Sequence, residues 1–223
     1  PGAIVHVSQV RHEFWFGTCI SNFAGTEDSL QSESRQIYND TLARYFNTAV
    51  HENALKWRQL TDRWGDAWSP NYTIADTILN WCETNDIKMR GHCLFWANKS
   101  YVPGWAKSLS DDSLRLAIKE HLLDITARYR GRIDEWDLNN EMLHHSYFRS
   151  RLGDDIVDSM FVWAKQGNPD AVLYLNDYSI LAGGKDDNYV RQVRGLLERD
   201  LPLGGIGCQG HFGSGVGDTS NLR

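Results

Sequence analysis

Short apolar or β-branched runs alternate with amphipathic stretches along the whole chain. The runs have the length of strands, and the stretches between them repeat their apolar residues at helical spacing. The strand candidates are Phe14–Gly17, Thr48–Val50, Lys88–Phe95, Ile133–Leu138, Ala171–Leu175 and Gly205–Gln209. The helix candidates are Ser32–Tyr45, Ile74–Glu83, Asp111–Tyr129, Asp154–Gln166 and Asp186–Asp200.

Strict alternation of strand and helix predicts an α/β fold with a parallel sheet, either doubly wound or closed into a barrel. A doubly wound dinucleotide-binding domain usually carries a GxGxxG turn after its first strand, whereas Thr18-Cys19-Ile20 follows Gly17 here. The sequence therefore favours a (β/α)8 TIM barrel, of which about six βα units are visible. Because no linker or break in composition divides the chain, we expect one barrel domain over residues 1–223. We expect this domain to be incomplete at both ends.

The composition is that of an ordinary globular protein, with 41% hydrophobic and 23% charged residues in a chain of 223. The net charge of −6 makes a nucleic acid or an anionic membrane a poor partner. No apolar run approaches the ~20 residues that a membrane span requires. The nine tryptophans are more than usual, and indole rings either stack on sugars or fill a core. Four scattered cysteines without a CxxC pair favour buried free thiols over a disulfide scaffold or a zinc site.

Polar and aromatic side chains follow each predicted strand, where the active site of a barrel lies. Amides, imidazoles, a lysine and tryptophans converge there with few charges, which suits a neutral, polyhydroxylated ligand. The residues in question are His51, Glu52, Asn53, Lys56 and Trp57, then Arg90, His92 and Trp96, then Asn139, Asn140 and Glu141, then Asn176, Asp177 and Tyr178, and finally Gln209 and His211.

Glu141 is the candidate for proton transfer, because it directly follows an apolar strand and adjoins an amide. Its position alone also fits an ordinary glutamate at a helix N-terminus. With His144 it spells E-x-x-H, but a di-iron site needs two such copies on a helical bundle and the chain has one. For His92 and His211 we favour hydrogen bonding over metal binding, because no third ligand has fitting spacing. We expect neither a metal nor a cofactor.

Together these segments resemble glycoside hydrolase family 10, the retaining endo-β-1,4-xylanases. The chain contains segments similar to the family's FG, FN…ENxxKW, RGHxLxW, PxW, WDxxNE, NDY and IGxQxH motifs, in family order. They are Phe16-Gly17, Phe46-Asn47 with Glu52 to Trp57, Arg90 to Trp96, Pro103 to Trp105, Trp136 to Glu141, Asn176 to Tyr178, and Ile206 to His211. Any one motif is a weak signal, but the ordered set spans nearly the whole chain.

The resemblance implies hydrolysis of xylan by double displacement, with two carboxyls about 5–5.5 Å apart and a covalent glycosyl-enzyme intermediate. Glu141 would be the acid/base catalyst, and Asn140 would hold the sugar 2-hydroxyl. Sugars on the non-reducing side would be bound by Glu52, Asn53, Lys56, His92 and Trp96. Tyr178 would line the leaving-group side, and Gln209 and His211 would lie near the nucleophile.

Two departures from the family pattern bear on these expectations. The nucleophile of the family is a glutamate on the seventh strand, which we expect beyond residue 223. Ala97 stands where the family usually has a histidine. A non-catalytic xylan-binding pseudoenzyme or fragment, or a related β-glycanase, therefore remains as an alternative. Because xylan lies outside the cell, the resemblance also implies a secreted or cell-surface protein.

Overall fold

The computed structural model describes residues 2–8, 13–22, 32–63, 69–181 and 186–211. The strands are β1 (Gly17–Ile20), β2 (Thr48–His51), β3 (Lys88–Gly91), β4 (Phe95–Trp96), β5 (Glu135–Asn140), β6 (Val172–Asp177) and β7 (Leu203–Cys208). The α-helices are α1 (Ser32–Tyr45), α2 (Thr73–Thr84), α3 (Gly104–Ser108), α4 (Asp111–Arg128), α5 (Tyr147–Leu152), α6 (Asp155–Gly167) and α7 (Asp186–Leu197). A π-helical turn η2 (Gln59–Arg63) and a 3₁₀ turn η3 (Lys99–Tyr101) complete them.

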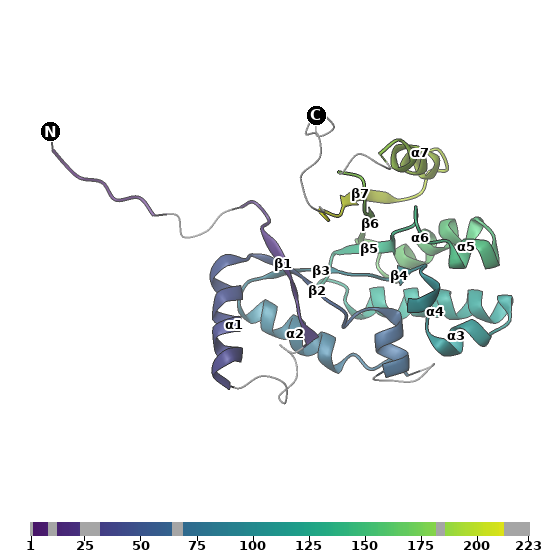
Figure 1. Cartoon of the computed structure of the whole chain (residues 1–223), viewed down its shortest axis with the longest axis horizontal. Coiled ribbons are helices and arrows are strands. Elements are labelled where there is room, and N and C mark those ends of the chain that lie inside the picture. Colours follow the sequence, from purple (N-terminus) through teal and green to yellow (C-terminus); the bar gives the residue numbers. More distant parts are fainter. Residues whose placement is uncertain (1, 9–12, 23–31, 64–68, 182–185, 212–223) are drawn as a thin grey trace.

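All strand pairs are parallel, and the strands follow one another across the sheet in the order β1-β2-β3-β5-β6-β7, with β4 also paired to β5. Figure 1 shows helices packed along this curved sheet. A doubly wound sheet reverses its strand order at a switch point, and this order has no reversal. The prediction of a TIM-barrel fold is confirmed, and the described residues form part of such a barrel, with β1 and β7 at its two edges.

The first strand was predicted in the wrong place. The prediction was Phe14–Gly17, but β1 begins at Gly17 and runs to Ile20. Ile20 is fully buried and supplies the apolar contact of this strand, whereas Phe14 and Phe16 are exposed. Phe16 stacks on Phe46 with a centroid distance of 5.2 Å. The aromatic run therefore packs beside the sheet and does not form a strand.

The third predicted strand, Lys88–Phe95, is divided into β3 and β4. Both pieces pair with β5, and between them the N–H of Leu94 still donates to the carbonyl oxygen of Asp137 at 2.9 Å. The division brings the side chain of Trp96 level with Asn140. Two short helices, α3 and α5, were not predicted, because each is too short to show a helical period.

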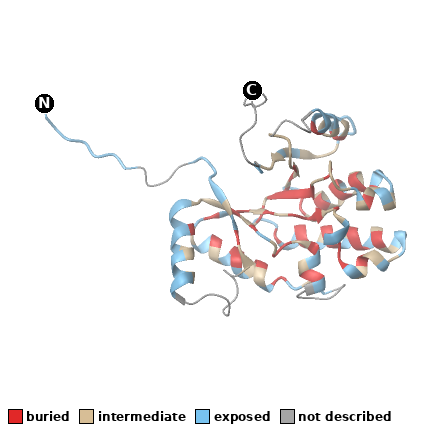
Figure 2. Ribbon diagram, viewed as in Figure 1, coloured by how far each residue is buried: buried red, intermediate tan, exposed pale blue. Residues whose placement is uncertain are grey.

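Helix α4 shows how the apolar pattern becomes a core. Leu114, Ile118, Leu122 and Ile125, which recur at helical spacing, are all fully buried. The Ser110 side chain accepts a hydrogen bond from the N–H of Ser113 and so caps the helix. In Figure 2 the buried residues lie along the strands and on the helix faces turned toward them.

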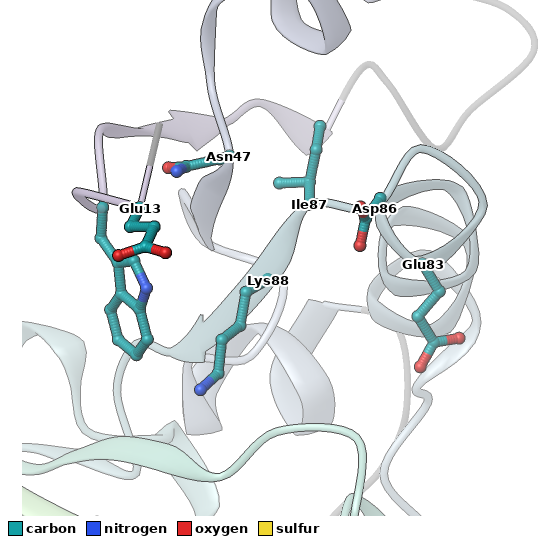
Figure 3. A pocket seen from close by; sticks show the side chains of 7 residues that line it. Glu13, Asn47, Glu83, Asp86, Ile87 and Lys88 are labelled. Atoms are coloured by element: carbon teal, nitrogen blue, oxygen red, sulfur yellow. The ribbon is translucent and has the colours of Figure 1, made fainter. Parts of the chain in front are cut away.

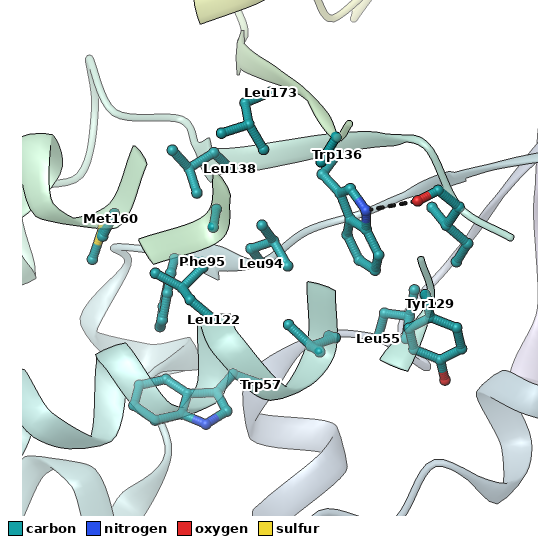
Figure 4. Packing of buried hydrophobic residues seen from close by; sticks show 14 of the residues in the cluster. Leu55, Trp57, Leu94, Phe95, Leu122, Tyr129, Trp136, Leu138, Met160 and Leu173 are labelled. Carbon is teal, nitrogen blue, oxygen red and sulfur yellow. Dashed lines mark hydrogen bonds between the residues drawn. The ribbon is translucent and has the colours of Figure 1, made fainter. Parts of the chain in front are cut away.

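The centre of the core is built around Trp136 on β5, which has no exposed surface (Figure 4). Its indole N–H donates to the carbonyl oxygen of Ile133 at 3.0 Å. A Cβ at Gly91 would lie 2.0 Å from the indole ring, so only glycine fits there. Trp57 is also buried, against Phe95. Both tryptophans therefore fill the core, which is one of the two roles that the sequence left open for them, the other being stacking on sugars.

The described cysteines are all free thiols, as predicted. Cys82 and Cys93 are buried and Cys208 is partly buried, but Cys19 is exposed, so the prediction of buried thiols fails at that position. No helix in the described part of the chain is long and apolar enough to cross a membrane.

Candidate active site

The predicted site residues lie at the carboxyl ends of the parallel strands and therefore at one edge of the sheet. Glu52, Asn53 and Lys56 follow β2, His92 follows β3, Trp96 ends β4, Asn140 ends β5 with Glu141 next, Tyr178 follows β6, and Gln209 and His211 follow β7. The strand register aligns Trp96 with Asn140, Asn140 with Asn176, and Asn176 with Gly207. Residues far apart in sequence thus lie side by side at the same position along neighbouring strands.

Glu141 is held by contacts from three strands. Its backbone has a φ of 59°, and its N–H donates to the carbonyl oxygen of Asn176 at 2.7 Å. The indole N–H of Trp96 donates to Oε2 at 2.7 Å, and the side-chain amide of Gln209 donates to Oε1 at 3.3 Å. The side chain is 12% exposed, so the carboxyl is largely shielded from water. A left-handed backbone at a non-glycine residue is unusual and commonly marks a functional site.

Asn140 is buried next to Glu141, and its amide has a fixed orientation. Its Oδ1 accepts hydrogen bonds from Nδ2 of Asn176 at 2.9 Å and from Nε2 of Gln209 at 3.3 Å. The same Gln209 amide therefore bridges Asn140 and Glu141. The structure confirms that these side chains come together, and Asn176 joins them as a residue to which the sequence assigned no role.

Trp96 also joins the acid/base candidate to the residues after β2. Tyr101 stacks on its ring at a centroid distance of 4.0 Å, and Nζ of Lys56 lies 5.1 Å from the ring centroid. Lys56 donates to Oδ1 of Asn53 at 3.0 Å. The side chain of Glu52 is exposed, and no described contact joins it to these residues.

His92 is oriented by a carboxylate that the sequence reasoning missed. Asp137, buried in β5, accepts from Nδ1 of His92 at 2.8 Å and from the guanidinium of Arg90. Arg90 lies over the ring of Tyr174, 3.8 Å from its centroid. A charged residue in the middle of an otherwise buried strand requires such partners, and that signal could have identified Asp137 from the sequence.

Tyr178 is positioned through a second buried carboxylate. Its ring stacks on His144 at a centroid distance of 3.6 Å. Nδ1 of His144 lies 2.6 Å from Oδ1 of Asp177, which also accepts from the N–H of Tyr178. The imidazole of His144 is thus engaged with Asp177, and its backbone N–H donates to the carbonyl oxygen of Glu141 at 3.0 Å.

His145 is a neighbour of Glu141 that the sequence reasoning did not single out. Its Nε2 lies 3.3 Å from Oε2 of Glu141 and 3.3 Å from Nδ2 of Asn98. The two residues are four apart, a spacing that brings side chains together in a helical turn, and the N–H of His145 donates to the carbonyl oxygen of Glu141 at 2.9 Å. The N–H of Tyr147 then donates to the carbonyl oxygen of Ala97 at 3.1 Å and fixes the loop against β4.

The residues after β7 are less enclosed. The N–H of Gln209 donates to the carbonyl oxygen of Asp177 at 2.8 Å, but His211 is exposed, and the structure joins it to none of the other predicted residues. None of the hydrogen bonds or ion pairs of Glu141 in the described part of the chain involves a second carboxylate. The polar stretch 212–223 lies outside the described residues.

Two titratable groups lie buried behind the site. Burial lowers the pKa of His51 to about 4, although its Nε2 lies 3.0 Å from the carbonyl oxygen of Ala75. Burial likewise raises the pKa of the Cys93 thiol to about 12, so this cysteine is not a nucleophile at neutral pH.

An open hollow of about 830 Å³ lies at the opposite end of the sheet (Figure 3). Its walls include Glu13, Trp15, Asn47, Asp86 and Lys88, which come before or at the start of the first three strands. The Lys88 ammonium lies 4.3 Å from the centroid of the Trp15 ring and covers it. No predicted site residue lines this hollow, so its size alone does not make it the candidate site.

Three comparisons with known proteins agree with this arrangement. A family model described as glycosyl hydrolase family 10 matches residues 8–223. Endo-1,4-beta-xylanase 1 of Arabidopsis thaliana is 39% identical over 220 residues, which cover 97% of this chain and 22% of that protein. Anti-sigma-I factor RsgI6 of Acetivibrio thermocellus is 34% identical, over 96% of this chain and 27% of that protein.

The crystal structure of native xylanase 10B from Thermotoga maritima superimposes with a TM-score of 0.78 at 29% identity, over 88% of this chain and 60% of that one. The chain thus spans about a quarter of the length of the two curated relatives and about 60% of the solved structure. Since the family model covers nearly all of its residues, the chain belongs to glycosyl hydrolase family 10.

Proposed function

We propose that the protein hydrolyses β-1,4-xylan within the chain, with retention of configuration and with Glu141 as the acid/base. The observation that carries this proposal is the shielded Glu141 carboxyl at the end of β5, held by Trp96 and Gln209 from two other strands. A carboxyl fixed in this way can deliver a proton to a glycosidic oxygen and later accept one from water. Membership of the family and the names of the xylanase relatives support the choice of xylan.

The roles proposed for the remaining residues follow from the resemblance to the family. Asn140, whose amide is fixed next to Glu141, is proposed to hold the sugar 2-hydroxyl. The other residues are proposed to line the sugar-binding groove: Glu52, Asn53, Lys56, His92 and Trp96 on one side of the scissile bond, Tyr178 on the other, and Gln209 and His211 near the nucleophile. Double displacement also needs a second carboxylate about 5–5.5 Å from Glu141, and we propose that a glutamate beyond residue 223 supplies it.

The acid/base role is tested with Glu141→Gln, which retains the shape of the side chain but has no acidic proton to donate. Its NH2 group cannot accept, so one of the two hydrogen bonds from Trp96 and Gln209 is lost. We expect hydrolysis of unactivated xylan to fall about 10²–10⁴-fold, because this is the usual contribution of a positioned acid. An aryl xylobioside with an acidic phenol as leaving group needs little protonation, so the first step on that substrate should be nearly unaffected. Equal losses on both substrates, or full activity on xylan, would contradict the assignment.

A second candidate function is binding of xylan without hydrolysis. One observation favours it: one similar protein is named an anti-sigma factor. Titration calorimetry with xylo-oligosaccharides, combined with analysis of the products, separates the two functions. Binding without any released sugar would favour this candidate, and a preference for cello-oligosaccharides would point to a related β-glycanase.

We propose that the protein acts outside the cell or at the cell surface. Xylan is a polymer of cell walls, and an enzyme that cuts within its chain must reach it there. Fractionation of the source cells, with an antibody against this chain, tests the proposal. Recovery of the protein from the cytosol alone would contradict it.

A further inference from the structure

His144 and Tyr178 form a pair of stacked rings beside Glu141. Their ring centroids are 3.6 Å apart, and their planes differ by 13°. Within the described residues no other aromatic ring stacks on Tyr178, and this tyrosine is partly exposed. One face of the Tyr178 ring is therefore closed by His144, and a ligand can approach only the opposite face and the edge.

The position of His144 is fixed from two directions. Its backbone N–H donates to the carbonyl oxygen of Glu141 at 3.0 Å, and its Nδ1 donates to Oδ1 of Asp177 at 2.6 Å. Asp177 is buried, and its oxygens also accept from the N–H groups of Tyr178 at 2.9 Å and of Leu143 at 2.7 Å. The same carboxyl therefore holds the imidazole and the backbone of the residue on which the imidazole stacks.

The stacked pair lies close to the acid/base candidate. Glu141 and His144 are three residues apart on the turn after β5, and Tyr178 follows the neighbouring strand β6. Burial raises the pKa of the Tyr178 hydroxyl, and the nearby carboxyls of Glu141 and Asp177 add to this shift. The E-x-x-H spacing, to which the sequence assigned no role, thus places the acid and the support of Tyr178 on one turn.

A fixed tyrosine ring binds a sugar more tightly than a mobile one. The C–H face of a sugar stacks on an aromatic ring, and a side chain that becomes ordered only on binding reduces the affinity. His144 lessens this cost, because it keeps the ring of Tyr178 in one orientation before the sugar arrives. Since the stacked face is closed, the sugar is also directed to the opposite face.

We propose that His144 is a positioning residue for the leaving-group side of the site: it holds the ring of Tyr178 so that the departing sugar can stack on the opposite face. The inference rests on the role proposed above for Tyr178, and it assigns no making or breaking of a bond to His144. The ring of His144 supports Tyr178 directly, whereas its hydrogen bond to Asp177 orients the imidazole.

Two variants separate the ring of His144 from its hydrogen bond. His144→Asn keeps an N–H donor near the position of Nδ1 but removes the ring, and His144→Phe keeps a ring but removes the donor. We compare kcat/KM on xylotetraose, which places a sugar beside Tyr178, with kcat/KM on β-xylobiosyl fluoride, whose leaving group has no ring. His144→Asn should lower kcat/KM on xylotetraose about two- to tenfold, the range that corresponds to one ordered side chain. It should leave the value on the fluoride nearly unchanged, and His144→Phe should recover most of the loss.

The outcome is decided by the difference between the two substrates. Equal losses on both in His144→Asn would overturn the proposal, because they would indicate a general disturbance of the site. In a Tyr178→Ala background, His144→Asn should cause no further loss on xylotetraose. An additive loss there would show that His144 does not act through Tyr178.

The stack itself is measured by NMR on protein with labelled tyrosine, which needs no hydrolysis. The ring current of the imidazole should shift the ring protons of Tyr178 upfield, and these signals are assigned by their absence from Tyr178→Phe. The shift should disappear in His144→Asn and persist in His144→Phe. Unshifted Tyr178 signals in the wild type would overturn the proposal even if xylan is cleaved. Hydrolysis of neither substrate by the wild type would instead contradict the proposed function, and the NMR result would still show whether His144 holds Tyr178.

Discussion

Strands β5 and β7 are both six residues long and both lead directly into the candidate site, yet their surroundings differ. Every residue of β5 is buried, with β3 and β4 on one side and β6 on the other. In the described part of the chain β7 pairs only with β6, has no buried residue, and leaves Ile206 55% exposed. Glu141 thus follows a strand that is paired on both sides, whereas Gln209 follows a strand paired on one side and is held by hydrogen bonds to Asp177, Asn140 and Glu141.

The largest expected effect is on stability, and it compares the truncation of a buried side chain on β5 with that of a half-exposed one on β7. Trp136→Ala should lower the free energy of unfolding by about 3–5 kcal/mol, because it empties a fully buried indole site. Ile206→Ala, on the edge strand, should change it by no more than about 0.5 kcal/mol. Urea unfolding of both variants measures this. A large loss in Ile206→Ala would mean that another segment covers β7.

Because His51 is buried, we also expect the stability of the fold to decrease in acid. Burial lowers the pKa of His51 from its ordinary value of 6.5 to about 4, so the unfolded chain binds the proton more tightly than the fold does. The stability that the neutral, buried His51 contributes is therefore complete above pH 6.5 and is lost as the pH falls toward 4. At pH 4.5 the loss in unfolding free energy is about 2–3 kcal/mol.

The check is urea unfolding of wild type and His51→Gln at pH 7 and at pH 4.5. Because glutamine does not titrate in this range, the difference in unfolding free energy between the two pH values should be smaller in the variant by that amount. An equal difference in both proteins would show that His51 does not carry the effect.

Asp137→Asn tests how far a buried carboxylate of β5 supports both the fold and the candidate site. The variant leaves the guanidinium of Arg90 without its carboxylate partner, and the free energy of unfolding should fall by about 1–3 kcal/mol. His92 also loses the carboxylate that orients its ring, so KM for xylo-oligosaccharides should rise. Steady-state kinetics and urea unfolding measure the two effects. Unchanged kinetics would mean that the orientation of His92 does not depend on Asp137.

Gln209→Ala should give the smallest effect, because this amide comes from the edge strand and its two hydrogen bonds are both 3.3 Å long. We expect kcat/KM on xylo-oligosaccharides to fall about tenfold or less, and stability to remain within about 0.5 kcal/mol. Gln209→Glu serves as a control that keeps the size of the side chain but replaces the N–H donors with acceptors. A loss in Gln209→Ala comparable to that of Glu141→Gln would show that β7 holds the site as firmly as β5 does.

Much of the site could be predicted because each strand is followed at once by its polar residues. Parallel strands direct their carboxyl ends to one edge, so Trp96, Asn140, Glu141 and Gln209 had to approach one another. The contact between His145 and Asn98 could not be predicted, because it joins residues far apart in sequence and depends on Asn98 being the cap of a 3₁₀ helix.

The sequence by itself determined the alternation of strands and helices, the parallel barrel-type sheet and the edge at which the site lies, since these follow from periodicity and from the direction of the chain. The tertiary structure decided the start of β1, the division of the third strand, and which side chain orients which. Those outcomes depend on side-chain volume and on hydrogen-bond partners that are distant in sequence, as with Gly91 under Trp136 and Asp137 beside His92. Local pattern carries no information about such pairs.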